Sequence, residues 1–472
     1  MPSSDAESKG RGLPVWLRRL VKGIVVVALF VAVDVLMTLA LEPYGTAAEV
    51  TWHEYRAATA AGESIDTIVV GSSYSQRNVD PATLDGQLGS HSFSLSTPAQ
   101  SLQNSLACLR TAAADHDIKR ALILINTNSL QSEPWYHARV TFLQAKSLGE
   151  APNEVLRNVS EIALDPENFG NVKSFGWALP WMYSSVGYDV QAISDNISNR
   201  MTYANPVDAA ALVDPDWTYV GQGHGIYDGT LDFERIPADV GYAYLSTAPL
   251  LERNMAELAA LCDYAKQQGI ELYVVNSPRP RYAYAQHAED NYTDLLAQVE
   301  GLVREHGATY YDMNLAREAF YRVQPEEFID SEHLNIAGSE HLSAALGELI
   351  AANETGEDVS GWFYGLDEWD EFIADHDVIE LAWFYSTVTQ DRQHIDFTAG
   401  ALTVPTGLEL EYQYAIEDYK NGHFYVVRPY SSDPTYRYQC HGYRDDVTVR
   451  VSVRVVGSTG QEPVSHIATV FY

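Results

Sequence analysis

The sequence has few cysteines and few basic residues, and both shortages limit what the protein can be. Its three cysteines, Cys108, Cys262 and Cys440, are too few and too scattered for a CxxC metal site or a disulfide framework, which leaves open only a single bridge. The chain carries 30 Lys and Arg against 64 Asp and Glu, a net charge of −34. So acidic a protein repels phosphate backbones, and we expect no nucleic-acid binding.

Several familiar motifs are missing as well. The sequence has no HExxH pair, EF-hand loop, Walker loop or Rossmann glycine pattern, so we expect no metal site and no nucleotide cofactor. We find no internal repeat or low-complexity tract. The chain has 472 residues and is 46% hydrophobic, which allows about three structural units with sizeable cores.

An apolar stretch near the N-terminus predicts a membrane anchor. Residues 24–41 are apolar except for Asp34 and Thr38, and a basic tail at 1–23 precedes them. The stretch is longer than a signal-peptide core of roughly 7–15 residues, which favours an uncleaved single-pass anchor over a cleaved signal. The basic tail predicts a cytoplasmic N-terminus and an extracytoplasmic remainder. Asp34 is either a tolerated charge or a polar contact to a multi-span partner.

The next 300 or so residues alternate strand-like and helix-like segments, which predicts an α/β domain with a mainly parallel sheet over residues 46–352. We expect strands at 65–70, 92–95, 121–125, 271–275 and 309–311, and helices at 100–114, 251–268, 290–306 and 337–352. Residues 131–246 interrupt the pattern and are interpreted as an insertion. Its tryptophans and tyrosines either stack on sugar rings or pack the insertion onto the sheet.

The C-terminal region, 359–472, has a different pattern. Five valines alternate with polar residues between Val447 and Val455, which is typical of a half-buried strand. We therefore predict a β-sandwich-like second domain of about 115 residues. It is either a carbohydrate-binding module or a spacer for protein contacts, and Trp362, Trp369 and Trp383 do not separate the two.

The first candidate site residue follows the first predicted strand. The run Ile68-Val69-Val70-Gly71-Ser72-Ser73 places small residues and hydroxyls where a buried strand leaves the sheet. Open α/β sheets bind ligands at this edge. If the next segment opens a helix, the backbone N–H of Ser73 points where an oxyanion would form. The alternative is an ordinary turn.

A second segment supplies the partners that a serine nucleophile needs. In Asp330-Ser331-Glu332-His333 the acid and the imidazole are three positions apart, so both face the same way in a helical turn. Asp330 can then accept the Nδ1–H of His333 and leave Nε2 free to take a proton from a serine. The alternative is a capping carboxylate beside a surface histidine.

These two segments resemble the first and last blocks of the SGNH, or GDSL-like, hydrolase superfamily. Their Gly-Ser-Ser is most similar to membrane-anchored relatives of the D-alanyl-lipoteichoic acid biosynthesis and alginate O-acetyltransferase accessory types. The resemblance implies a three-layer α/β fold and a Ser-His-Asp triad. In this chain Ser73 would be the nucleophile, His333 the base and Asp330 its orienting partner.

The resemblance also implies an oxyanion hole. Ser94-Leu95-Ser96-Thr97-Pro98-Ala99-Gln100-Ser101 resembles the second block, with Ala99 where the family usually has Gly. Asn126-Thr127-Asn128-Ser129 stands where the superfamily has Gly-Thr-Asn-Asp. The backbone N–H groups of Ser73 and Ala99 and the side chain of Asn128 are therefore the expected donors, with Asn126 as the competitor. An Asn-rich turn that satisfies its own backbone is the alternative for this segment.

Two arginines after the predicted strand 271–275, Arg279 and Arg281, are candidates to bind a carboxylate or phosphate of the substrate. Alternatively, they pair with acidic residues on the surface.

Together these patterns predict a membrane-anchored serine esterase or O-acyltransferase that acts outside the membrane on a cell-surface glycan. The resemblance implies a multi-span O-acyltransferase as partner. The alternative function is a non-catalytic protein of the same fold that binds glycans or assists envelope assembly.

Overall fold

The computed structural model describes residues 14–132, 189–230, 247–280, 292–330, 332–369, 371–372, 378–404, 408–441, 445–458 and 463–472, and all structural statements concern these ranges. Most of the predicted insertion, with Trp135, Trp177 and Trp181, lies outside them. Arg281 lies outside them as well.

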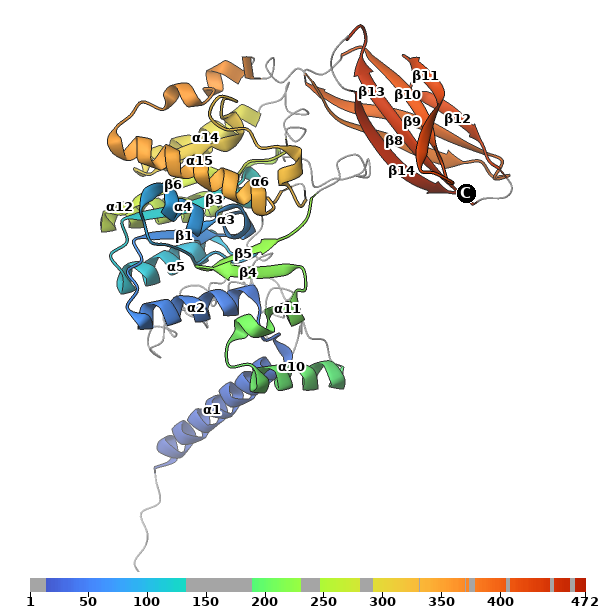
Figure 1. The fold of residues 1–472 in the computed structure, drawn as a ribbon. Helices are drawn as coiled ribbons and strands as arrows, with labels where there is room; N and C mark the ends of the chain where they lie inside the picture. The colour runs from blue at the N-terminus through green and yellow to red at the C-terminus, as the bar shows by residue number, and fades with distance from the viewer. Residues whose placement is uncertain are drawn as a thin grey trace, which may run out of the picture.

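The first domain is built on a sheet covered by helices (Figure 1). This sheet is parallel and has five strands in the order β2-β1-β3-β6-β7. Its strands are β1 Thr67–Gly71, β2 Ser92–Ser94, β3 Arg120–Ile125, β6 Glu271–Asn276 and β7 Thr309–Asp312. All five lie close to the predicted positions, and the predicted α/β class is confirmed. Their apolar runs are buried because helices cover both faces of the sheet.

The alternation of side chains along β1 separates the two helix layers. Ile68 and Val70 face one layer and Val69 faces the other. The first layer contains α2 (Ala47–Ala61), α5 (Leu102–Asp115), α12 (Glu252–Gln268) and α14 (Tyr292–Glu305). The second contains α3 (Ser73–Asn78), α4 (Pro81–Leu88) and α15 (Ile336–Thr355).

The strand order sets the place of a binding crevice. The chain passes from β1 to β2 on one side, and β3 then lies on the other side of β1. Ligands bind open α/β sheets at such a reversal, outside the carboxyl ends of the strands. Two helices begin at these ends, α3 after β1 and α6 (Thr127–Gln131) after β3.

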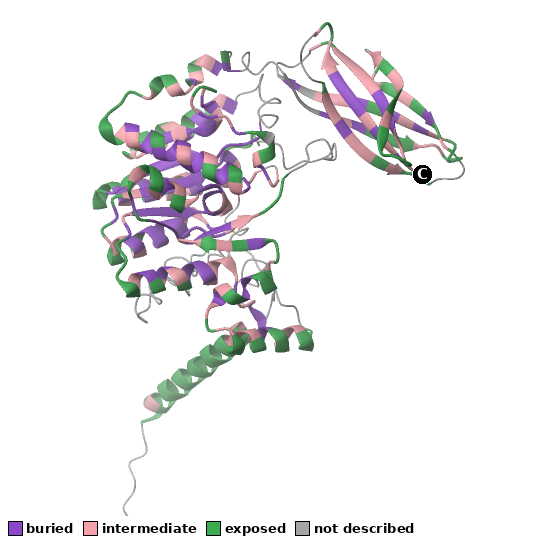
Figure 2. Cartoon of the chain, viewed as in Figure 1, coloured by how far each residue is buried: buried purple, intermediate pink, exposed green. Residues whose placement is uncertain are grey.

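A single helix in the described residues, α1 (Val15–Leu41), is long and apolar enough to cross a membrane. It begins before the predicted stretch 24–41 and includes the basic residues Arg18, Arg19 and Lys22. Its apolar side chains are exposed along most of its length (Figure 2).

Residues 189–230 form small elements beside the sheet. They are α10 (Val190–Thr202), η3 (Pro206–Ala209), α11 (Ala210–Val213), β4 (Trp217–Gly221) and β5 (His224–Tyr227). The β4–β5 hairpin is antiparallel, and Trp217 is buried over Gly225. The N–H of Ser94 on β2 donates to the carbonyl of Gln222 at 2.8 Å, which joins the hairpin to the edge of the main sheet.

The C-terminal region is all antiparallel, as predicted. Its strands are β8 Val378–Val388, β9 His394–Val404, β10 Leu410–Asp418, β11 His423–Ser431, β12 Thr435–Gln439, β13 Asp446–Val455 and β14 Val464–Phe471. They form two sheets, β11-β10-β13-β14 and β12-β9-β8, around one core. Val447, Val449, Val451 and Val453 are buried in that core, which confirms the predicted half-buried strand.

Several short 3-10 helices lie between β7 and the C-terminal strands. They are η6 Met313–Leu315, η7 Pro325–Glu327, η8 Ser360–Trp362 and η9 Leu366–Glu368. Trp369 and Phe372, which follow the predicted boundary at 359, pack with Tyr292 and Leu296 of α14. All three cysteines are free thiols, so the single bridge that the sequence left open does not form.

Candidate active site

Ser73 is the first residue of α3, at the carboxyl end of β1. Gly71 makes the sharp turn from strand to helix with φ +135°, and a Cβ there would lie 2.3 Å from the Ser75 Oγ. That Oγ accepts a hydrogen bond from the Leu124 N–H of β3 at 2.8 Å. The start of α3 is therefore fixed to the central strand, and Ser73 is held at the edge of the sheet.

His333 lies in the loop between η7 and α15. Its position is set by Asn78 at the end of α3, whose Oδ1 accepts from the Leu334 N–H at 2.9 Å. The same buried Asn78 donates to the Ser277 Oγ at 2.8 Å. Because one amide joins the helix of Ser73 to the loop of His333, the two residues cannot shift independently.

The structure brings Ser73, His333 and Asp330 into one chain of hydrogen bonds. The Nε2 of His333 lies 2.8 Å from the Ser73 Oγ, and its Nδ1 lies 2.8 Å from the Asp330 Oδ2. An ionised carboxylate can only accept hydrogen bonds, so Nδ1 carries the proton and Nε2 presents a lone pair to the hydroxyl. This is the arrangement of a serine activated by a general base.

Asp330 is held in its ionised form. Burial would raise its pKa, but the hydrogen bond and charge of His333 and the backbone N–H groups of Glu332 and His333 outweigh it, so the pKa lies below its ordinary value. The guanidinium of Arg77 is 3.8 Å from the same carboxylate. An ionised carboxylate in this position can stabilise a positive charge on the ring of His333. Arg77 lies one helical turn after Ser73 on α3 and was not predicted, because nothing in the local sequence marks it as a site residue.

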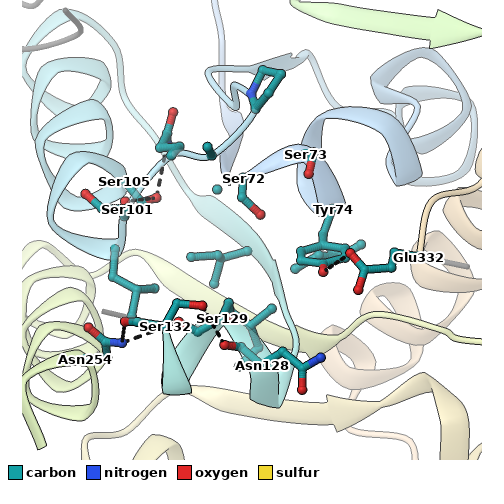
Figure 3. Close-up of a pocket in the computed structure, with 18 of the residues that line it drawn as sticks. Ser72, Ser73, Tyr74, Ser101, Ser105, Asn128, Ser129, Ser132, Asn254 and Glu332 are labelled. Atoms are coloured by element: carbon teal, nitrogen blue, oxygen red, sulfur yellow. Dashed lines mark hydrogen bonds between the residues drawn. The ribbon is translucent and has the colours of Figure 1, made fainter. Parts of the chain in front are cut away.

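A second set of contacts supports the imidazole ring. The ring of Tyr74 stacks on that of His333, with 5.3 Å between centroids and 18° between planes. The Tyr74 hydroxyl donates to Glu332 at 2.8 Å, as Figure 3 shows, and burial holds the pKa of this phenol well above its ordinary value. Neither Tyr74 nor Glu332 was predicted as a site residue, although each is adjacent in sequence to one that was.

Arg279 also contacts this set of side chains, and we call Tyr74, Glu332 and Arg279 the platform of the His333 ring. Its guanidinium donates to the Glu332 Oε1 at 2.9 Å, and its side chain is 1% exposed. Arg279 is not one of the described residues that line the cavity beside Ser73. The position of Arg279 agrees with the alternative that it pairs with an acidic residue. Its partner is Glu332, beside His333, and not a carboxylate elsewhere on the surface.

The expected oxyanion donors border the same cavity. Ser73, Ala99 and Asn128 all line it. Asn126 instead caps α6, because its Oδ1 accepts from the Ser129 N–H at 2.7 Å. The structure thus distinguishes the two asparagines: Asn128 borders the cavity and Asn126 caps the helix.

Ala99 has an unusual backbone. In the segment Thr97-Pro98-Ala99-Gln100 the Gln100 N–H donates to the Thr97 carbonyl at 3.1 Å, and Ala99 has φ +57°. A turn with Pro second and a positive φ third favours Gly at the third position. The glycine typical of the resembled family would therefore suit this backbone, and alanine adopts it under strain.

The cavity has a volume of about 480 Å³. Its lining combines apolar side chains, such as Leu102 and Ile123, with hydroxyl and amide side chains near α5, α6 and the start of α12. The polar group includes Ser101, Ser105, Ser129, Ser132 and Asn254 (Figure 3). The hydroxyls can both donate and accept hydrogen bonds, and the apolar side chains can contact the nonpolar part of a substrate.

Comparison with known protein families finds no family model that matches the chain, and no curated protein matches it either. Among solved structures, a GDSL-like lipase from Bacteroides thetaiotaomicron is similar at 9% identity and a TM-score of 0.25, over 64% of this chain and 98% of that one. A two-domain esterase active on acetylated mannans is similar at 10% identity and a TM-score of 0.28, over 92% of this chain and 97% of that one. At these values neither likeness supports an argument about the present chain.

The strain at Ala99 generates a prediction. Ala99→Gly should raise the free energy of unfolding by about 0.5–1 kcal/mol, because relief of the left-handed strain, about 1–2 kcal/mol, exceeds the added entropy of the unfolded chain. Urea denaturation measures the change. Ala57→Gly, on the exposed side of α2, is the matched control and should lower stability by about 1 kcal/mol. If Ala99→Gly destabilises as much as the control, position 99 is not strained.

Proposed function

We propose that this protein is a serine-dependent acyl-transfer enzyme, an esterase or O-acyltransferase, with Ser73 as nucleophile. The observation that supports the proposal is the unbroken chain of 2.8 Å hydrogen bonds from Ser73 through His333 to Asp330. Serine is a weak nucleophile unless a positioned base takes its proton. A surface histidine beside a capping carboxylate, the alternative for this segment, has no need of the bond to Ser73.

Acylation follows from this geometry. The Ser73 Oγ attacks the carbonyl carbon of an ester while His333 Nε2 accepts the hydroxyl proton. Asp330 remains ionised and stabilises the resulting imidazolium. The tetrahedral intermediate then expels the alcohol, which takes the proton back from His333, and an ester bond to Ser73 remains.

The negative charge that develops on the carbonyl oxygen needs donors fixed in advance. The N–H of Ser73 at the start of α3, the N–H of Ala99 and the side-chain amide of Asn128 are the proposed donors. All three residues border the cavity that Ser73 faces. Such donors lower the barrier because they need no reorganisation as the charge forms.

Deacylation determines whether the enzyme is a hydrolase or a transferase. His333 deprotonates the second nucleophile, which is water in an esterase and a sugar hydroxyl in a transferase. We propose a glycan or other hydroxylated polymer outside the membrane as the acyl acceptor or donor. The hydroxyl and amide side chains in the cavity support a substrate with hydroxyl groups. The helix α1, with its basic first turns, supports an anchored, extracytoplasmic enzyme.

We also propose that a multi-span O-acyltransferase partner supplies acyl groups from across the membrane. Asp34 lies within the apolar part of α1 and is the residue through which such a partner would contact the anchor.

Replacement of the nucleophile tests the proposed reaction. Ser73→Ala should lower ester turnover by at least about a thousandfold, as replacement of the nucleophile does in other serine triads. The matched control is Ser72→Ala, since Ser72 also lines the cavity and its side chain does not cap α3. Hydrolysis of p-nitrophenyl acetate by the two purified variants provides the comparison. Equal turnover in Ser73→Ala and the parent would reject Ser73 as nucleophile.

The two asparagines provide a separate test of the oxyanion donors. Asn128→Ala should lower kcat by about 10²–10³, the usual cost of one lost donor. Asn126→Ser retains a capping oxygen for α6 but lacks an amide donor, and it should keep kcat near that of the parent. The opposite pattern, with activity lost only in Asn126→Ser, would transfer the donor role to Asn126.

A further inference from the structure

The carboxyl end of α1 is held by α10, a helix more than 150 residues later in the sequence. The Nδ2 of Asn196 donates to the carbonyls of Leu39, Ala40 and Glu42 at 3.3, 3.1 and 2.8 Å. Its Oδ1 accepts from the Tyr44 N–H at 2.9 Å. Carbonyls at the end of a helix have no partner within the helix, and here one buried amide satisfies them.

Arg200, one turn further along α10, makes the connection rigid. Its guanidinium donates to the carbonyls of Leu39 at 3.1 Å and Glu42 at 2.9 Å, where the dipole of α1 favours a cation. It also pairs with Glu49 of α2 at 3.0 Å. Because α2 packs on the sheet, the contacts of Arg200 hold α1 and the catalytic domain in a fixed relative orientation, which a flexible linker would not do.

These contacts set the depth of α10 relative to a membrane that α1 crosses. The apolar residues 24–41 form about 27 Å of helix, close to the roughly 30 Å of a hydrocarbon core. The end of this stretch therefore lies at the boundary between hydrocarbon and headgroups. Since α10 hydrogen-bonds to residues 39–42, it lies at the same boundary.

One side of α10 exposes apolar side chains at that depth. Val190, Ile197 and Met201 are 81%, 40% and 84% exposed, and their spacing places them on one side of the helix. Gln191 and Asp195 lie on the opposite side. Figure 2 shows that most of α10 is exposed. An amphipathic helix of this kind is suited to the interface of a bilayer.

We propose that α10 lies in the headgroup region of the bilayer that α1 crosses, on the side of the catalytic domain, with Val190, Ile197 and Met201 inserted toward the acyl chains. The inference depends on α1 being the proposed anchor, but not on catalysis. A single spanning helix leaves the domain free to tilt, whereas a second helix at an angle to it holds the domain in one orientation. The cavity at Ser73 is then kept at a constant height above the membrane.

The chemistry of α10 indicates what it binds. Asp189 and Asp195 make its polar side acidic, and its one basic residue, Arg200, is engaged with α1 and α2. Attraction to anionic lipid therefore contributes little, and burial of the apolar side chains provides the affinity. Neutral phosphatidylcholine is a sufficient bilayer for the test.

Spin labels on α10 provide the measurement. The full chain carries Cys440→Ser, since Cys108 and Cys262 are buried and burial raises the pKa of both thiols. Nitroxide is attached to Ile197→Cys or Met201→Cys, with Asp195→Cys as the matched control on the same helix. After reconstitution in phosphatidylcholine vesicles, collisions with oxygen and with a water-soluble nickel chelate are compared by electron paramagnetic resonance.

Oxygen partitions into acyl chains and the nickel chelate stays in water. The ratio of oxygen to nickel collisions should be at least several-fold higher at 197 and 201 than at 195. Equal, water-like ratios at all three positions would overturn the proposal, as would low collision rates with both reagents at 197 and 201, which would indicate a protein partner on this side of α10.

A label at Leu29→Cys, in the middle of the apolar part of α1, separates this result from failure of the anchor. Protection of 29 from nickel with exposure of 197 and 201 contradicts only the role of α10. Exposure of 29 contradicts the anchor and the role of α10 together. Neither result bears on Ser73, because no catalytic activity is measured.

Discussion

The hydrogen bond from Ser73 to His333 is the contact on which the proposed chemistry depends. It joins the residue that follows the first strand of the sheet to a loop 260 positions later, just before α15. Neither side chain has a reactive role alone, because the hydroxyl needs a base and the base needs a fixed tautomer. Asp330 supplies the tautomer, and Asn78 keeps the loop of His333 against the helix of Ser73.

The sheet explains why these segments meet. Parallel strands end at the same edge, so the residues after β1, β2 and β3 all border one crevice, and the order β2-β1-β3 places this crevice where the strand order reverses. The platform of Tyr74, Glu332 and Arg279 adds a second constraint, since it supports the flat side of the imidazole while Asp330 holds its edge. Rotation of the ring away from Ser73 would break both sets of contacts.

The sequence allowed prediction where the signal is local. Buried apolar runs located all five parallel strands, and the alternating valines of β13 located a strand of the second domain. Gly71-Ser72-Ser73 and Asp330 to His333 were recognisable because each sits at a turn with chemistry-bearing side chains. The separation of Asn126 from Asn128 was harder, since the capping bond of Asn126 to Ser129 and the place of Asn128 at the cavity are visible only in the structure.

Features that depend on contacts between distant segments left no local pattern. Arg279 looked like a surface or substrate-binding cation because its partner, Glu332, is 53 positions away. The hairpin β4–β5 lay within a region interpreted as an insertion, although it pairs with the edge of the sheet through Ser94. The role of Asn196 at the end of α1 likewise became visible only once the two helices were placed side by side.

The proposed chemistry requires that His333 activates Ser73. A fluorophosphonate probe reacts only with such a serine, and mass spectrometry of the labelled chain identifies the modified residue. One adduct is expected, on the hydroxyl of Ser73, and it should be lost in His333→Ala. Absence of any adduct, or an adduct on Ser73 that persists unchanged in His333→Ala, would contradict the proposed chemistry.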